Sequence, residues 1–207
     1  LIESIASLPA SERTELISSL SEDQLKVLSN DWRSWARPEQ MAPDGQWQTW
    51  LIRAGRGFGK TRSGAEWVKE RVESGLATRI ALVGQTPADV RDIMIQGESG
   101  FLNIYPDGQA PKYEPSKRRL TWPNGAFALA FSSWRPDLLR GPQFDTAWCD
   151  EVGSWKYSTE TWDNLQLSLR LGPDPRCVVT TTPRPIEVLR KLIADPHCVQ
   201  TTGSTYA

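Results

Sequence analysis

The sequence predicts an α/β fold in which helices cover both faces of a mainly parallel β-sheet. Short apolar runs alternate with amphipathic segments along most of the 207 residues, and this rhythm is typical of parallel strands joined by crossover helices. The length suits one such domain with a small appendage. Hydrophobic residues make up 39% of the chain and charged residues 24%, which is a globular composition. No apolar run approaches the ~20 residues of a membrane span, so we expect no membrane association.

The N-terminal part is expected to form short helices. Ser21-Glu22-Asp23-Gln24 has the pattern of a capping box at the start of a helix. Pro38 ends this stretch, and Pro43-Asp44-Gly45 reads as a turn. We therefore divide the chain into a helical N-terminal segment, residues 1–40, and a larger domain, residues 41–207. The first residues lack a secretory signal, which favours an intracellular protein.

The larger domain is expected to begin with a strand, a glycine-rich loop and a helix. Trp50–Ile52 is the apolar strand, and a helix follows from about Thr61 to Ser74. The next strand is Arg79–Gly84, after which Thr86-Pro87 starts a helix that continues to about Ile95.

The middle of the chain differs from this rhythm. Arg119–Trp122 and Phe127–Phe131 flank the turn residues Pro123-Asn124-Gly125, which predicts an inserted antiparallel hairpin. The β-then-α order then returns with the strands Thr146–Cys149, Cys177–Thr181 and Cys198–Thr202 and the helices Thr159–Leu171 and Pro185–Ala194.

The glycine-rich loop predicts a phosphate-binding site of the P-loop kind. Its glycines allow backbone N–H groups to converge on phosphate oxygens, and they are Gly55, Gly57 and Gly59. Lys60 would reach the β- and γ-phosphates, and the hydroxyl of Thr61 would bind Mg²⁺. Ala54 stands where the strict motif has glycine, so the motif is the relaxed form. The cofactors that this loop predicts are ATP and Mg²⁺.

Two adjacent acids end the strand that begins at Thr146. Ligands of parallel sheets bind at the carboxyl ends of the strands, so we expect Asp150 to hold the metal and Glu151 to orient and deprotonate the attacking water. The two acids point in different directions along a strand, which suits two roles. The alternative is an ordinary polar strand end.

Further candidates contact the nucleotide through hydroxyl or amide groups. Thr180-Thr181-Thr182 follows the next apolar strand, and Thr181 and Thr182 would contact the γ-phosphate or the attacking water. Gln46 lies shortly before the first strand and would read the adenine edge. Threonine is also a common strand residue, so its presence in this run has an ordinary explanation as well.

Three arginines are candidates for stabilising charge on the transferred phosphoryl group. Arg56 lies inside the loop and would act on the nucleotide of its own chain, while Arg140 would reach the nucleotide of a neighbouring subunit. Arg184 follows the threonine run. Surface solvation is the ordinary explanation for Arg140 and Arg184.

Composition argues against other types of site. Three scattered cysteines and one histidine do not suggest a zinc site or a disulfide framework. Lys plus Arg (24) nearly balance Asp plus Glu (25), so contact with a polyanion must be local. The densest basic cluster is Lys112, Lys117, Arg118 and Arg119, which is a candidate DNA-contacting surface or a solvated patch.

The stretches Trp50–Trp67, Cys149–Glu151 and Thr180–Pro185 resemble the large terminase subunit of tailed bacteriophages and related gene transfer agents. The resemblance implies a P-loop ATPase of the additional-strand, catalytic-glutamate type, which moves double-stranded DNA into a procapsid in the cytoplasm of a bacterial host. It also implies a homo-oligomeric ring on the portal protein and a small terminase subunit as partner. Family members usually carry a C-terminal nuclease domain, which we expect to be absent from this chain.

Other ATP-dependent classes remain open at this stage. A helicase-like ATPase would use the same loop and acids, although we expect no second motor domain in this length. A small-molecule P-loop kinase or a non-enzymatic nucleotide-binding scaffold would not require Glu151.

Overall fold

The computed structural model describes Ile5 and residues 8–203, and the chain divides into two compact units whose boundary along the sequence falls between Ala42 and Pro43. The N-terminal unit contains the helices α1 (Ala10–Ser19), α2 (Glu22–Asn30) and α3 (Trp32–Trp35) and the 3₁₀ turn Pro38–Gln40. The expected capping box is present, because the Ser21 hydroxyl accepts from the backbone N–H of Gln24 and the Gln24 side chain accepts from the Ser21 N–H.

The larger unit is built on one eight-stranded sheet with the order β3-β4-β5-β2-β6-β7-β1-β8. The strands are β1 (Thr49–Ala54), β2 (Arg79–Gly84), β3 (Lys112–Glu114), β4 (Arg119–Thr121), β5 (Phe127–Ser132), β6 (Thr146–Asp150), β7 (Arg176–Thr181) and β8 (Cys198–Gly203). All neighbouring pairs are parallel except those of β4, which runs against β3 and β5. The predicted mainly parallel α/β class is confirmed, and β7 is the additional strand between β1 and β6.

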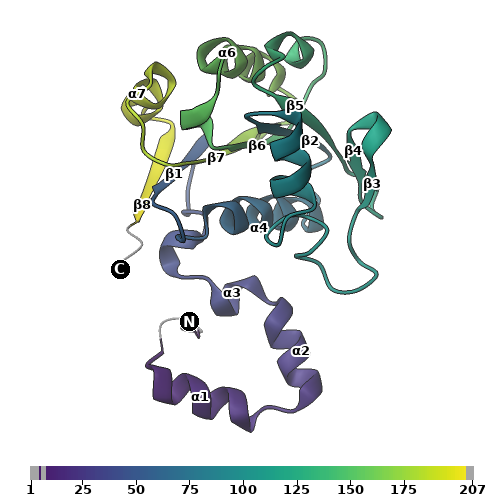
Figure 1. The fold of residues 1–207 in the computed structure, drawn as a ribbon, viewed down its shortest axis with the longest axis vertical. Coiled ribbons are helices and arrows are strands. Elements are labelled where there is room, and N and C mark those ends of the chain that lie inside the picture. The colour runs from purple at the N-terminus through teal and green to yellow at the C-terminus, as the bar shows by residue number, and fades with distance from the viewer. Residues whose placement is uncertain (1–4, 6–7, 204–207) are drawn as a thin grey trace. The chain divides into compact units, whose positions relative to one another are not determined.

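Helices cover both faces of this sheet. Figure 1 shows α4 (Lys60–Glu73) on one face and α6 (Ser158–Ser168) and α7 (Glu187–Ala194) on the other. Strand residues alternate between the two layers: Leu51 and Val179 belong to the core beneath α6 and α7, whereas Trp148 packs against Gly64 of α4. Trp148 is fully buried and makes an edge-to-face contact with Phe101.

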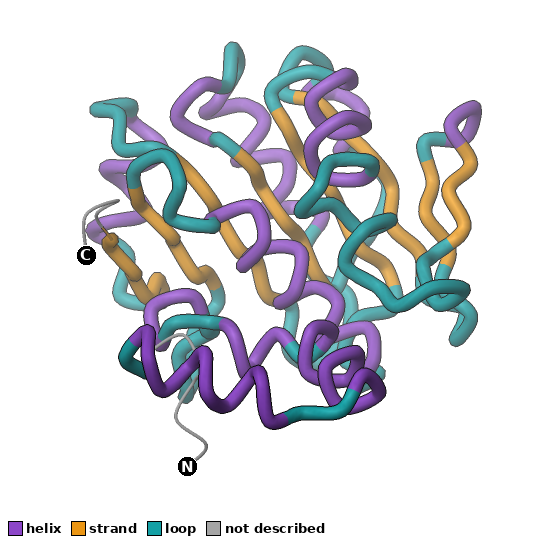
Figure 2. The backbone as a smooth tube through the Cα atoms, turned by 60° about the horizontal axis from the view of Figure 1, so that its bottom comes forward, coloured by secondary structure: helices purple, strands orange, loops and turns teal. Residues whose placement is uncertain are grey.

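The carboxyl ends of β1, β6 and β7 lie at the same end of the sheet, its carboxyl edge, because these strands are parallel neighbours. Figure 2 shows the strands of the sheet side by side. The loop after β1 leads into α4, β6 ends at Asp150, and β7 ends at Thr181. This edge therefore gathers the three sequence segments in which most site residues are expected.

The predicted hairpin is present, but it extends the main sheet. Leu120 pairs antiparallel with Ala128, as expected, while the other side of β5 pairs parallel with β2 and β3 adds to β4. An extended strand exposes hydrogen-bonding groups on both sides, and local sequence does not tell which neighbours will use them.

Two helices differ from their expected limits. The helix predicted over Thr159–Leu171 ends at Ser168, because Leu169 forms a parallel bridge with Phe144 and the N–H of Leu171 donates to the Phe144 carbonyl. The helix expected up to Ile95 consists of α5 (Pro87–Asp89) and a π-helical stretch, Val90–Ile95. In the described part of the chain, no helix is long and apolar enough to cross a membrane.

Candidate nucleotide-binding site

The glycine-rich loop takes a backbone shape that glycine permits. Gly57 and Gly59 have φ values of 78° and 89°, in the left-handed region that side chains with a Cβ rarely adopt. Gly59 stands directly before Lys60, the first residue of α4. The loop therefore runs straight into the helix N-terminus, whose first N–H groups have no intrahelical acceptor and suit a phosphate.

Phe58 anchors this loop to the sheet. Its ring is only 3% exposed and lies directly over Gly203 at the end of β8, where an added Cβ atom would collide with the ring. Arg56 and Gly57 on the preceding turn are exposed. The Phe58 side chain thus packs the loop against the end of β8, and Arg56 remains at the surface.

Lys60 and Glu151 come together at the carboxyl edge. The buried Lys60 donates from Nζ to the Gly55 carbonyl at 3.0 Å, and the same Nζ lies 3.6 Å from Oε1 of Glu151. Glu151 has a left-handed backbone, with φ of 48°, and its carboxylate accepts from the N–H of Thr182 at 3.1 Å and from the Thr182 hydroxyl at 3.2 Å. The lysine, the glutamate and the threonine therefore form one cluster.

Asp150 lies deeper than Glu151. It is 5% exposed, and its Oδ1 accepts a 2.6 Å hydrogen bond from the Thr180 hydroxyl. Burial raises the pKa of Asp150 to about 6, against the opposing effects of the Thr180 hydrogen bond and of the Lys60 charge. The charges of Glu151 and Asp89 also raise this pKa.

The oxygen atoms at this edge suit a small, hard cation. Neither the Thr61 hydroxyl nor Oδ2 of Asp150 has a hydrogen-bond partner among the residues that the structure describes. Those residues contain no group of three or more His, Cys, Asp or Glu side chains that could hold a metal ion by themselves. An ion here would need oxygen atoms from phosphates and water as well, which is the usual binding mode of Mg²⁺.

Thr181 is turned away from this cluster. Its buried hydroxyl accepts from the N–H of Gly153 at 2.9 Å and donates to the Thr182 carbonyl at 3.0 Å. Adjacent strand residues point to opposite faces, so Thr180 and Thr182 contact the acids while Thr181 braces the segment that follows Glu151.

Two further predicted site residues are not brought to the cluster. Gln46 precedes the amino end of β1, so the length of that strand separates it from the glycine loop at the carboxyl end. Arg140 lies beside α6, where its Nε donates to Oδ1 of Asn164 at 3.1 Å and its guanidinium is 3.8 Å from Glu160. These contacts of Arg140 are therefore with α6 and not with Lys60, Asp150 or Glu151.

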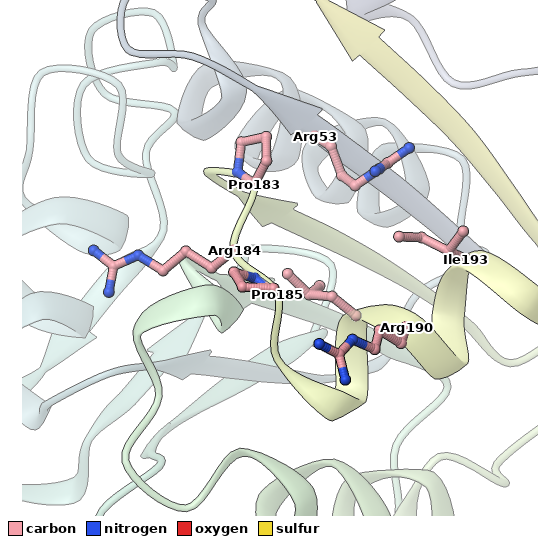
Figure 3. A pocket seen from close by; sticks show the side chains of 7 residues that line it. Arg53, Pro183, Arg184, Pro185, Arg190 and Ile193 are labelled. Atoms are coloured by element: carbon pink, nitrogen blue, oxygen red, sulfur yellow. The ribbon is translucent and has the colours of Figure 1, made fainter.

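Arg184 borders a groove of about 320 Å³ next to the threonine run. The groove is lined by Arg53, Pro183, Arg184, Pro185, Leu189, Arg190 and Ile193. Figure 3 shows that the guanidinium groups of the three arginines point in different directions. They do not converge on a common anion.

The basic cluster lies on β3, on β4 and on the turn that joins these two strands. Lys117 pairs with Glu114 at 2.7 Å, and the Arg119 guanidinium stacks over the Phe127 ring at 4.1 Å. Lys112 and Arg118 are exposed. Part of the cluster thus has partners within the fold.

Two residues that act on Asp150 were not predicted from the sequence. The charge of Asp89 contributes to its raised pKa, and the indole of Trp148 donates to Thr180 Oγ1 at 3.0 Å. Asp89 carries the signal of a helix cap, since its carboxylate bonds Thr86, and Trp148 carries that of a core residue. Nothing in their sequence context points to a site.

Comparisons with known proteins cover the part of the chain that contains Lys60, Glu151 and Thr182. The family model described as "Terminase large subunit, T4likevirus-type, N-terminal" matches residues 51–203. No curated protein matches the chain. The Thermus phage P74-26 large terminase ATPase domain is similar in fold, with a TM-score of 0.63 and 13% identity over 89% of this chain and 85% of that one.

A large terminase from another thermophilic bacteriophage is also similar. Its complex with ADP gives a TM-score of 0.57 and 17% identity over 90% of this chain, and its complex with ATP-γ-S gives 0.55 and 16%. This chain spans 46% of that terminase in the ADP complex, about half its length. Because the matched family segment contains the glycine loop, the paired acids and the threonine run, the chain belongs to the N-terminal domain family of the terminase large subunit.

Proposed function

We propose that this chain is the ATP-hydrolysing motor domain of a large terminase, which drives double-stranded DNA into a viral or virus-like procapsid. The observation that supports the proposal best is the convergence of Lys60, Asp150 and Glu151 at the carboxyl edge of the sheet. This convergence occurs inside the segment that the terminase family model matches. The related terminase from a thermophilic bacteriophage was crystallised with ADP and with ATP-γ-S, which favours ATP as the nucleotide.

The residues of the cluster would share the work of binding. The loop amides and the start of α4 would hold the phosphates, and Lys60 would leave Gly55 and Glu151 to bind the β- and γ-phosphate oxygens. Thr61 and Asp150 would hold Mg²⁺ together with the nucleotide, and the ion would neutralise phosphate charge.

Glu151 would act as the general base. Once Lys60 binds phosphate, the Glu151 carboxylate loses its ion-pair partner while the N–H and hydroxyl of Thr182 still orient it. It would accept a proton from the attacking water. Arg56 would stabilise the transferred charge in its own chain and Arg140 in a neighbouring chain of a ring.

The partners of the proposed motor are double-stranded DNA, the portal protein and a small terminase subunit. A ring of identical subunits on the portal would place Arg140 of each chain near the nucleotide of the next. We also propose that the helical N-terminal segment, residues 1–40, and the ATPase domain, residues 41–207, are the two parts of this chain.

The test separates nucleotide binding from hydrolysis in two variants. Lys60→Ala should abolish ATP turnover, whereas Glu151→Gln should still bind ATP and stop hydrolysing it. Lys191→Ala and Glu187→Gln are matched controls, because these side chains form an exposed ion pair on α7. ATPase activity is measured with and without linear double-stranded DNA and portal protein.

Two outcomes would contradict the proposal. Normal hydrolysis by Glu151→Gln would show that another group is the base. Phosphorylation of a small acceptor without DNA would favour the kinase class.

A further inference from the structure

A continuous hydrogen-bonded chain joins Trp148 to Asp150 through Thr180. The Trp148 indole Nε1 donates to Thr180 Oγ1 at 3.0 Å, and Thr180 Oγ1 donates to Asp150 Oδ1 at 2.6 Å. An indole N–H can only donate, so the hydroxyl accepts from it. The hydroxyl proton is left for the carboxylate, and the Cys149 carbonyl is a more distant alternative acceptor at 3.3 Å.

The strand register sets this chain on one face of the sheet. Asp150 pairs with Thr180 across β6 and β7, and Trp148 precedes Asp150 by two residues. Residues two apart on a strand share a face, and directly paired residues do as well. All three side chains therefore point toward the layer that contains α4.

The same indole contacts the helix that starts the phosphate site. A Cβ atom on Gly64 would lie 2.5 Å from Nε1 of Trp148, so the α4 backbone rests directly on the indole. Gly64 follows Lys60 and Thr61 by about one helical turn. One side chain thus touches the Lys60–Thr61 helix and, through Thr180, holds Asp150.

The buried hydroxyl needs an explanation, since Thr180 is fully buried in a central strand. Valine has nearly the same shape and packs well in such strands, whereas a buried hydroxyl is costly unless it is hydrogen-bonded. Here the hydroxyl binds Oδ1 of Asp150 and leaves Oδ2 without a partner among the described residues. The carboxylate is therefore held with one oxygen occupied and the other available.

We propose that Trp148 and Thr180 are positioning residues, which fix Asp150 relative to the first turn of α4, so that Asp150 and Thr61 would hold Mg²⁺ together with a nucleotide. This inference rests on the proposed function. The proposal predicts a specific effect. Loss of the hydrogen bonds from Trp148 to Thr180 and from Thr180 to Asp150 weakens the Mg²⁺-dependent part of nucleotide binding and leaves the Mg²⁺-independent part unchanged.

The experiment measures the affinity of the full chain for a fluorescent ATP analogue with Mg²⁺ and with EDTA. Thr180→Val should lower the affinity in Mg²⁺ about tenfold, in keeping with the loss of one hydrogen bond to a charged group, and leave the affinity in EDTA unchanged. Thr180→Ser should restore it. Trp148→Phe keeps an aromatic ring against Phe101 but removes the indole donor, and it should show the same Mg²⁺-specific loss to a smaller extent.

Thr161→Val is the matched control. Thr161 is also fully buried and donates to the Ser133 carbonyl, so its replacement reports the general cost of losing a buried hydroxyl. It should lower the thermal unfolding temperature without changing the effect of Mg²⁺ on affinity.

The possible failures are distinguishable. If the wild-type chain binds the analogue and Lys60→Ala does not, but Thr180→Val and Trp148→Phe respond to Mg²⁺ as the wild type does, the positioning role is overturned and the proposed function stands. Equal losses in Mg²⁺ and in EDTA would also overturn it, because they indicate a general structural role. If the wild-type chain shows no Mg²⁺-dependent binding, the proposed function fails and this inference fails with it.

Discussion

At the scale of single residues, the buried charge of Asp150 lowers the stability of the fold, although the same charge suits the proposed binding of Mg²⁺. A buried carboxylate is expensive to ionise, and the pKa of Asp150 is about 6 because burial outweighs the hydrogen bond from Thr180. The Lys60 charge favours the ionised form, while the Glu151 charge disfavours it. The group that would bind Mg²⁺ is therefore held in a place where its own charge destabilises the nucleotide-free fold.

The raised pKa of Asp150 predicts how the stability of the fold changes with pH. The folded carboxyl keeps its proton to a higher pH than the unfolded one, whose ordinary pKa is 3.8. The contribution of Asp150 to stability is therefore greatest below pH 3.8, falls as the pH rises through the window to about 6, and remains lower above it. The full loss is about 3 kcal/mol.

Asp150→Asn should raise the free energy of unfolding of the nucleotide-free protein at pH 7.5, because the amide carries no charge and still accepts from Thr180. The gain should be clearly smaller at pH 4.5, where the folded aspartate is already protonated. Urea unfolding at both pH values measures this, with the exposed Asp163→Asn as control. A gain of the same size at both pH values would show that the charge of Asp150 is not its cause.

At the scale of elements, the contact between α4 and β6 controls the position of the site. Glycine within a helix usually costs about 1 kcal/mol relative to alanine, yet Gly64 lies where a Cβ would meet the Trp148 indole. The close approach of α4 to β6 explains why a glycine occupies this position. The same close approach places Lys60 near the ends of β6 and β7.

Gly64→Ala should therefore destabilise the fold, by about 1–3 kcal/mol, because the added methyl group overpacks the interface. The double variant Gly64→Ala with Trp148→Leu should be less destabilised than the sum of the single changes. Glu70→Ala, on the exposed side of α4, is the control in the urea unfolding experiment. Increased stability of Gly64→Ala would mean that helix propensity outweighs the contact.

The hairpin shows how elements form beyond their local sequence. The turn Pro123-Asn124-Gly125 predicts two antiparallel strands, and β4 and β5 pair accordingly. Whether β5 also joins the parallel strands depends on β2, which lies more than 40 residues earlier in the chain. The turn residues predicted the pairing of β4 with β5, whereas the position of this hairpin in the sheet depends on packing with distant segments.

At the scale of the whole molecule, the candidate arginines belong to different places. Arg56 lies in the glycine loop, whereas Arg140 lies against α6 with its side chain 67% exposed. The proposed role of Arg140 is at the nucleotide of a neighbouring subunit, whereas the proposed role of Arg56 is at the nucleotide of its own chain. This separation makes the cis and trans roles testable in assemblies.

Arg140→Ala should lower the ATPase rate of the assembled motor by about 10³-fold or more while nucleotide affinity stays unchanged. Mixing Arg140→Ala with Glu151→Gln should restore part of the rate, because some sites then combine an intact Glu151 from one chain with an intact Arg140 from the next. Arg56→Ala should not be rescued in this way if Arg56 acts within its own chain.

ATPase measurements on mixtures with DNA and portal protein provide the test, and Arg190→Ala serves as the control for losing an exposed arginine. No recovery in the mixtures would place the function of Arg140 within its own chain.

The sequence by itself determined the glycine loop, the strand that ends in two acids and the parallel α/β pattern, because each depends on residues that are close in the chain. Glycine spacing permits the left-handed turns at Gly57 and Gly59, and an apolar run predicts a buried strand wherever it pairs. The tertiary structure decided which groups meet across the sheet.

Thr182 binds Glu151 while Thr181 turns to Gly153, and Trp148 reaches Asp150 only through Thr180. The same structure keeps Gln46 at the opposite end of β1 from the loop. These pairings depend on strand order, on register and on the face that each side chain takes. The long-range packing that fixes them is spread over the whole core, so no short stretch of the sequence encodes it.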